Sequence, residues 1–258
     1  MSSLPDPLPV AASRMRTAFG LLGRLMYGPI CWALFLVVSL MTLVLVFIVP
    51  SLNVRRAIAH HASGLFLRLA GMPMTVTRAE LLPSEPCVVV ANHASYLDGV
   101  ILKAALPPNF SFVIKKEMVR VPLAGMLLRR IGSEFVDRFN RHSGGMDTRR
   151  LLRAAAGGQS LAFFPEGTFT EQPGLARFHT GAFVIATRNG MPVVPIAIRG
   201  ARHNLPAGSL CPRPGRLEVE LLGVLPVPQT GDVNTAAIEL KDQARPMILK
   251  ALGEPDLA

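Results

Sequence analysis

A histidine and an aspartate with the spacing of an acid–base pair follow an apolar stretch of the chain. His93 and Asp98 come directly after residues 87–91, whose valines are typical of a buried strand. A neutral imidazole can remove a proton from a hydroxyl group, and a carboxylate beside it fixes the tautomer and stabilises the imidazolium that forms. Ser95 and Asp98 also have the spacing of a helix capping box, so a purely structural role for Asp98 is the alternative.

Two further turns carry charged side chains directly after short apolar runs. Glu166 lies between a proline and a glycine after residues 161–164, which predicts a rigid turn that carries an acid. Arg138 follows residues 134–136, and its planar guanidinium suits a phosphate group. Ligands of open α/β sheets bind beyond the carboxyl ends of the strands, so these turns are the first place to expect a site.

The elements that must position these side chains alternate between strand and helix. Strands are expected at residues 74–78, 87–91, 111–114, 134–136, 161–164, 193–198 and 217–224. Helices are expected at residues 95–105, 119–130, 146–156, 178–188 and 233–252. This alternation predicts a three-layer α/β fold for residues 72–258, with a largely parallel mixed sheet of about seven strands and helices on both faces.

The segment before this domain predicts a membrane anchor over residues 1–71. Residues 30–49 carry no charge over 20 residues, enough helix to cross an apolar layer about 30 Å thick. Basic, amphipathic flanks on both sides are typical of helices in the headgroup layer and give no orientation. A single span and a helical hairpin that enters one leaflet and returns are both open. A cleaved signal peptide or a buried core helix could also contain an apolar run of this kind.

Composition limits the class of protein. The chain has 258 residues, a net charge of +10 and 50% hydrophobic residues, which excludes a disordered chain. Three separated cysteines without a C-x-x-C pair support neither a disulfide framework nor a cysteine zinc site, and no metal is expected. The charge indicates an anionic partner. The chain has no nucleotide-binding glycine motif and few aromatic residues for base stacking, so no nucleic-acid partner is expected.

Four short motifs stand in one order along the chain. They are N-H-x-x-x-x-D at residues 92–98, a glycine followed by F-x-x-R at 132–138, F-P-E-G-T at 164–168, and V-V-P-I at 193–196. This order resembles the sequence blocks of the glycerophospholipid acyltransferase family, which includes 1-acyl-glycerol-3-phosphate acyltransferase. The resemblance covers residues 88–198 and implies that residues 72–258 form an acyltransferase domain.

The resemblance implies a role for each matching residue. His93 would remove the proton from an acceptor hydroxyl as it attacks an acyl thioester, and Asp98 would orient the imidazole. The residues implied to bind substrate are Asn92, Lys115, Arg138, Glu166, Gly167, Thr168 and Pro195. Among them, Lys115 and Arg138 would hold the acceptor phosphate, Glu166 and Gly167 would position the glycerol part, and Pro195 would shape the wall of the site.

The implied reaction needs no cofactor beyond its co-substrate. A thioester is activated enough for direct attack, and the chain has no G-x-S-x-G motif for a covalent acyl-enzyme. The expected donor is acyl-CoA or acyl carrier protein, and the expected partners are a lyso-lipid acceptor and membrane phospholipid. The expected location is the cytoplasmic face of a bacterial inner membrane.

One residue departs from the family pattern and leaves the acceptor open. Many lysophosphatidate-acylating members continue F-P-E-G-T with arginine, where this chain has Phe169. The main expectation is 1-acyl-glycerol-3-phosphate converted to phosphatidate. Another lyso-lipid, such as lyso-ornithine lipid, is a second possible acceptor. A non-catalytic protein that binds anionic lipid is a further possibility, although such a protein would have no need for His93 and Asp98 in this spacing.

Overall fold

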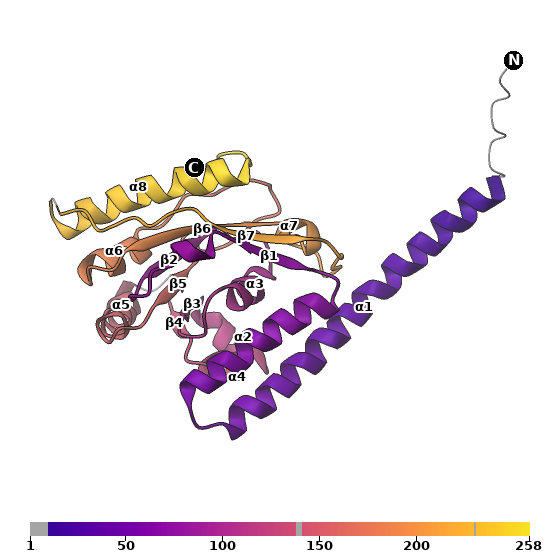
Figure 1. The fold of residues 1–258 in the computed structure, drawn as a ribbon, viewed down its shortest axis with the longest axis horizontal. Coiled ribbons are helices and arrows are strands. Elements are labelled where there is room, and N and C mark those ends of the chain that lie inside the picture. The colour runs from indigo at the N-terminus through magenta and orange to yellow at the C-terminus, as the bar shows by residue number, and fades with distance from the viewer. Residues whose placement is uncertain (1–9, 138–140, 230) are drawn as a thin grey trace, which may run out of the picture.

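One seven-stranded sheet forms the centre of the molecule (Figure 1). The computed structural model describes residues 10–137, 141–229 and 231–258. The strands are β1 Met74–Thr77, β2 Val88–Ala91, β3 Ser111–Lys115, β4 Glu134–Val136, β5 Leu161–Phe163, β6 Val193–Arg199 and β7 Leu217–Leu221. Their order is β1-β7-β6-β2-β5-β3-β4, and all neighbours are parallel except β6 and β7. The predicted mixed, largely parallel sheet is confirmed.

Helices cover both faces of this sheet, as predicted (Figure 1). They are α1 Val10–Ile48, α2 Leu52–Leu69, α3 Asp98–Ala105, α4 Ala124–Arg130, α5 Arg141–Ala156, α6 Gly181–Arg188, α7 Ala201–Asn204 and α8 Val233–Leu252. Two short 3₁₀ helices, η1 Ala79–Leu81 and η2 Lys116–Arg120, complete the described elements. The predicted helix at 119–130 is therefore divided between η2 and α4, and the helix predicted from residue 95 begins at Asp98.

The strand β2 is buried on both faces because each face meets a different set of helices. Val89 and Ala91 contact the core under α2 and α3, whereas Val88 and Val90 contact the core under α5, α6 and α8. Strands buried in this way read as continuous apolar runs rather than as alternating patterns. The run of valines before His93 thus belongs to a central strand, and His93 follows the end of β2 in the middle of the sheet.

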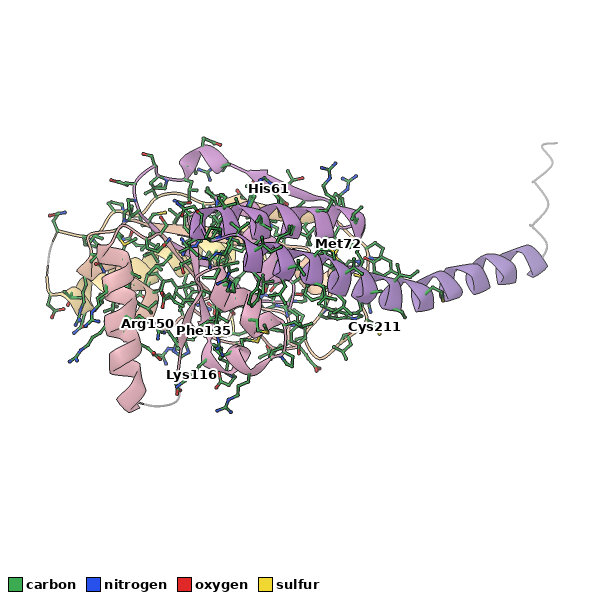
Figure 2. The ribbon with its side chains drawn as sticks, turned by 90° about the horizontal axis from the view of Figure 1, so that it is seen from below. His61, Met72, Lys116, Phe135, Arg150 and Cys211 are labelled. Carbon is green, nitrogen blue, oxygen red and sulfur yellow. The ribbon has the colours of Figure 1, made fainter. Side chains whose placement is uncertain are left out.

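Helices α1 and α2 form a hairpin beside the α/β domain. Residues 49–51 join them, and Figure 2 shows the two helices side by side, with α1 extending beyond the domain past Cys211. The apolar run is one continuous helix, and its segment Met26–Ile48 is long and apolar enough to cross a membrane. Of the 18 most apolar consecutive residues in this segment, 22% are buried. Helices α1 and α2 pack against each other as a hairpin, and both predicted membrane arrangements, the single span and the hairpin within one leaflet, stay predictions.

Helix α2 is joined to the domain by apolar and polar contacts. Phe66 and Leu67 lie in the core that α2 shares with α3 and the sheet. The buried guanidinium of Arg56 donates from Nε to the carbonyl oxygen of Ile131 (3.0 Å) and from Nη1 to Oε1 of Gln159 (2.8 Å). The domain boundary predicted between residues 71 and 72 stays a prediction. Helix α2 lies before that boundary and shares a core with the strands that follow it.

Candidate active site

His93 and Asp98 form a hydrogen-bonded pair where β2 ends and α3 begins. Nδ1 of His93 lies 2.8 Å from Oδ2 of Asp98, whose side chain is fully buried. The same oxygen accepts the backbone N–H groups of Ala94 (2.6 Å) and Ser95 (2.8 Å). The carboxylate therefore contacts the imidazole and also fixes the turn that precedes α3, and its part in catalysis stays a prediction.

The histidine ring contacts two phenylalanine rings. The ring of Phe164 stacks on it with a centroid distance of 4.4 Å, and the ring of Phe169 lies at 4.4 Å on a tilted plane. Because Nδ1 faces a carboxylate, Nδ1 carries the hydrogen and Nε2 is left with a lone pair. Within the described part of the chain, Nε2 makes no hydrogen bond, and 19% of the side chain is exposed. This nitrogen can accept a proton from a bound hydroxyl.

Glu166 connects the turn after β5 to the turn after β2. Its Oε1 accepts the backbone N–H of His93 (2.6 Å), and its Oε2 accepts the backbone N–H of Ala176 (2.8 Å). Burial raises the pKa of this carboxyl group, while the two backbone hydrogen bonds oppose the shift. The adjacency follows from the parallel pairing of β2 with β5, which brings the two strand ends together. A contact between Glu166 and the acceptor stays a prediction.

Asn92 directly follows β2, and Pro195 lies in the paired strand β6. Nδ2 of Asn92 donates to the carbonyl oxygen of Ile198 (3.0 Å), and Oδ1 accepts the N–H of Ile198 (2.7 Å). The buried Asn92 side chain thereby extends the pairing of the two strands beyond Ala91. Pro195 is buried opposite Val90 in this ladder. The side chain of Asn92 thereby holds the start of the His93 turn against β6, and the contacts of Asn92 and Pro195 with substrate stay predictions.

The remaining predicted binding residues lie around the same edge of the sheet or outside the described residues. Lys115 is the exposed last residue of β3, and Thr168 is exposed in the turn after β5. Gly167 has a φ of +81°, a left-handed conformation that suits glycine. Arg138 lies outside the described residues. The described strand β4 pairs with β3 and ends two residues before it, so the chain enters this segment at the edge that carries Lys115.

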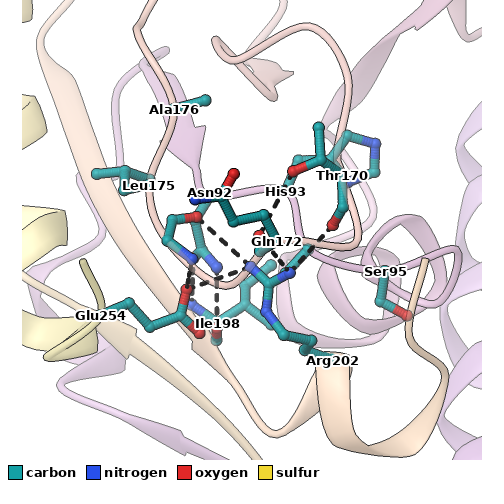
Figure 3. A network of polar contacts seen from close by, with 12 residues as sticks. Asn92, His93, Ser95, Thr170, Gln172, Leu175, Ala176, Ile198, Arg202 and Glu254 are labelled. Atoms are coloured by element: carbon teal, nitrogen blue, oxygen red, sulfur yellow. Dashed lines mark hydrogen bonds and ion pairs between the residues drawn. The ribbon is translucent and has the colours of Figure 1, made fainter. Parts of the chain in front are cut away.

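Two polar residues at this edge were not predicted. Figure 3 shows Arg202 of α7 and Glu254 of the C-terminal segment in contact with the loop after β5. Arg202 follows β6 in the way that His93 follows β2, so a cation just beyond a strand end was the available signal. Glu254 is distant in sequence from every motif and carries no such signal. Among the described residues, no cluster of three or more His, Cys, Asp or Glu could hold a metal ion.

Comparison with known proteins agrees with this geometry. Residues 73–199 match the sequence model of the Acyltransferase family. A chloroplastic 1-acyl-sn-glycerol-3-phosphate acyltransferase of Brassica napus is 31% identical over 219 residues, which are 81% of this chain and 60% of that protein. This chain belongs to the glycerophospholipid acyltransferase family. The segment that matches the acyltransferase model contains all four motifs, from Asn92 to Pro195.

Two other members of the acyltransferase family extend the comparison. A lyso-ornithine lipid O-acyltransferase of Pseudomonas aeruginosa is 34% identical over 137 residues, covering 53% of this chain and 52% of that protein. The chain thus spans roughly half to three fifths of the length of these curated relatives. The crystal structure of the 1-acyl-sn-glycerophosphate acyltransferase from Thermotoga maritima has the same fold, with a TM-score of 0.72 over 89% of this chain and 96% of that chain at 19% identity.

Proposed function

We propose that this protein transfers a fatty acyl group from a thioester to the free hydroxyl group of a lysophospholipid. The observation that carries the proposal is the bond between Nδ1 of His93 and the buried carboxylate of Asp98, which leaves Nε2 available as a base. The names of the relatives support 1-acyl-glycerol-3-phosphate as the acceptor and phosphatidate as the product.

In the proposed reaction, Nε2 of His93 takes the proton of the acceptor hydroxyl while the hydroxyl oxygen attacks the thioester carbonyl carbon. The tetrahedral intermediate then expels the thiolate, and the imidazolium returns its proton to the sulfur. Asp98 stabilises the imidazolium between these two steps. Phe164 and Phe169 pack against the ring, and these apolar contacts limit the access of water that would otherwise hydrolyse the thioester.

The acceptor phosphate is proposed to bind Lys115 and Arg138. The guanidinium of Arg138 can bind two phosphate oxygens at once, whereas an ammonium acts as a point charge. Arg138→Ala should therefore raise the Michaelis constant for a phosphorylated acceptor, and Arg138→Lys should restore only part of the loss. Unchanged constants in both variants would argue against phosphate recognition at this position.

A second acceptor is favoured by one contact in the site. Phe169 presents an aromatic ring to His93 at a motif position where many lysophosphatidate-acylating members have arginine. The lyso-ornithine lipid O-acyltransferase among the relatives supports an acceptor with a headgroup other than glycerol phosphate. The second candidate function is therefore transfer to a lyso-lipid of that class.

Attachment to a membrane through the α1–α2 hairpin is part of the proposal. The apolar span of α1 exposes large side chains along its length, among them Leu36, Met41 and Val44. Such a surface is unfavourable in water and matches the hydrocarbon layer that contains the acceptor. We propose the cytoplasmic face of a bacterial inner membrane as the location, where acyl-CoA or acyl carrier protein supplies the acyl group.

The deciding experiment compares wild-type protein with His93→Ala in detergent. Each is incubated with 1-acyl-glycerol-3-phosphate or lyso-ornithine lipid, and with acyl-CoA or acyl carrier protein loaded with the same chain. We expect wild-type transfer to at least one lyso-lipid and a turnover number about 10² to 10⁴ lower in the variant. Wild-type protein that acylates no lyso-lipid with either donor, or a variant as active as wild type, would contradict the proposal.

A further inference from the structure

Two guanidinium groups bind the loop that follows β5. That of Arg245 donates to the carbonyl oxygens of Leu175 (2.8 Å) and Ala176 (3.2 Å) at the end of the loop, and that of Arg202 binds the part before it. Arg202, in the short helix α7, donates from Nη1 to the carbonyl oxygens of Thr170 (3.1 Å) and Gln172 (3.2 Å). Its Nη2 lies 3.5 Å from the carbonyl oxygen of Gly174 and 3.2 Å from Oε2 of Glu254 (Figure 3). Three carbonyl groups of an irregular loop thus face one cation, whose side chain is only 19% exposed.

The C-terminal segment holds the same loop from its other side. Oε2 of Glu254 accepts the backbone N–H of Gly174 (3.0 Å) in addition to its ion pair with Arg202. The N–H of Leu175 donates to the carbonyl oxygen of Pro255 (3.0 Å), and the N–H of Leu257 donates to the carbonyl oxygen of Leu175 (3.1 Å). Glu254 therefore joins the guanidinium, the loop and the end of the chain.

Both halves of this loop reach the candidate base. In the first half, the ring of Phe169 lies 4.4 Å from the ring of His93 and 4.8 Å from that of Tyr96. In the second half, Ala176 donates its N–H to Glu166, whose other oxygen accepts the N–H of His93. A displacement of the loop would therefore move a ring that covers the imidazole and also change a bond that fixes its backbone.

We infer that Arg202 and Glu254 act as a latch that holds residues 164–176 over His93, and that they position the base without touching substrate. The inference rests on the proposed role of His93 as general base. A hydrogen-bonded guanidinium can hold three carbonyl groups in one plane, which neither lysine nor an apolar residue can do. Without Arg202, the carbonyl groups of Thr170, Gln172 and Gly174 lose their common donor, and Phe169 is free to leave the imidazole.

Arg199 provides a matched control, because it lies three residues away and makes contacts of the same kind elsewhere. It forms ion pairs with Glu218 (3.2 Å) and Glu220 on β7 and donates to the carbonyl oxygen of Ala251 (2.9 Å) in α8. Replacing Arg199 removes a guanidinium and its hydrogen bonds, but none of these bonds involves the loop after β5. Arg202→Met and Arg199→Met therefore differ chiefly in their effect on the loop.

The first readout does not depend on catalysis. Diethyl pyrocarbonate modifies accessible neutral imidazoles, and peptide mass mapping measures the rate at each histidine, with exposed His179 and His203 as internal references. We expect modification of His93 to be several times faster in Arg202→Met than in wild type, and unchanged in Arg199→Met. Phe169→Ala should also accelerate it, and adding Arg202→Met to Phe169→Ala should bring little further increase.

The second readout is steady-state transfer to the acceptor that the wild-type protein uses. We expect Arg202→Met to lower kcat/KM by about 10²-fold, the loss typical of a base displaced by about 1 Å. Glu254→Gln should cause a smaller loss, because the amide oxygen still accepts the N–H of Gly174, and Arg199→Met should stay near wild type. Equal effects of Arg202→Met and Arg199→Met in both assays would overturn the latch. A rate of His93 modification in Arg202→Met equal to that in wild type would overturn it as well. Wild-type protein without transferase activity would overturn the proposed function instead, and the modification rates would still test the latch.

Discussion

Asp98→Asn separates the charge of the carboxylate from its hydrogen bonds. Oδ2 of Asp98 accepts Nδ1 of His93 and the N–H groups of Ala94 and Ser95. An asparagine oxygen in this place keeps these acceptor contacts, so the turn and the direction of the imidazole are preserved. The variant loses the negative charge that stabilises the imidazolium, and its amide nitrogen takes the place of Oδ1, which is buried without a partner among the described residues.

The size of the effect follows from the geometry. With 2.8 Å between Nδ1 and Oδ2, the centres of the two charged groups are roughly 4 Å apart, and opposite unit charges at that distance attract by about 4 kcal/mol at an effective dielectric constant of 20. Each 1.36 kcal/mol corresponds to a factor of ten in rate. We therefore expect Asp98→Asn to lower the turnover number by about 10³.

The assay measures release of the thiol from an acyl thioester in the presence and absence of acceptor. Asp232→Asn is the matched control, because Asp232 caps α8 at an exposed position by accepting the N–H of Thr235 (2.8 Å), and asparagine caps helices equally well. A turnover number of Asp98→Asn within a few-fold of that of Asp232→Asn would refute the electrostatic argument and leave Asp98 with its structural role alone.

Burial lowers the pKa of Lys103 to about 8 from 10.5, so Lys103→Met should raise the free energy of unfolding at pH 7 by about 3 kcal/mol. That gain should shrink in denaturant titrations as pH rises from 8 towards 10.5, because the wild-type folded state is then neutral at this lysine while the unfolded chain still binds the proton. Arg56→Ala should cost about 3 kcal/mol in the same titrations, because it leaves buried carbonyl groups unpaired, whereas Arg68→Ala on the exposed face of α2 should cost little. Val44→Arg should lower the fraction of protein that sediments with membranes, and Ile238→Arg, at a similarly exposed position on α8, should leave that fraction unchanged.

The local elements followed from the sequence because their signals are local. Short runs rich in apolar and β-branched residues between turn residues marked all seven strands, and the four motifs placed the chemistry at strand ends. Helix starts were less certain. The sequence predicts a helix from residue 95, but the helix begins at Asp98. The carboxylate of Asp98 accepts the N–H groups of Ala94 and Ser95, and these bonds keep the turn before Asp98 out of the helix.

The partners of the charged and polar site residues were decided by the tertiary structure. Asn92 bonds the backbone of Ile198, 106 residues away, and Glu166 bonds the backbone of His93, 73 residues away. Motif spacing marks such residues as belonging to a site but contains no information on which backbone groups are left unpaired there. That depends on which strands are neighbours, and here β2 lies between β5 and β6.

The sequence by itself determined the strands, the apolar helix and the family motifs, because these depend on residues a few positions apart. Only the tertiary structure decided that α2 returns to share a core with the sheet, that β7 runs against β6, and that Arg202 and Glu254 meet at the loop over His93. Arg202 and Glu254 are 52 residues apart. Their contact exists because β6 and α8 end on the same side of the fold. No sequence pattern indicates that these two strand and helix ends lie close together in space.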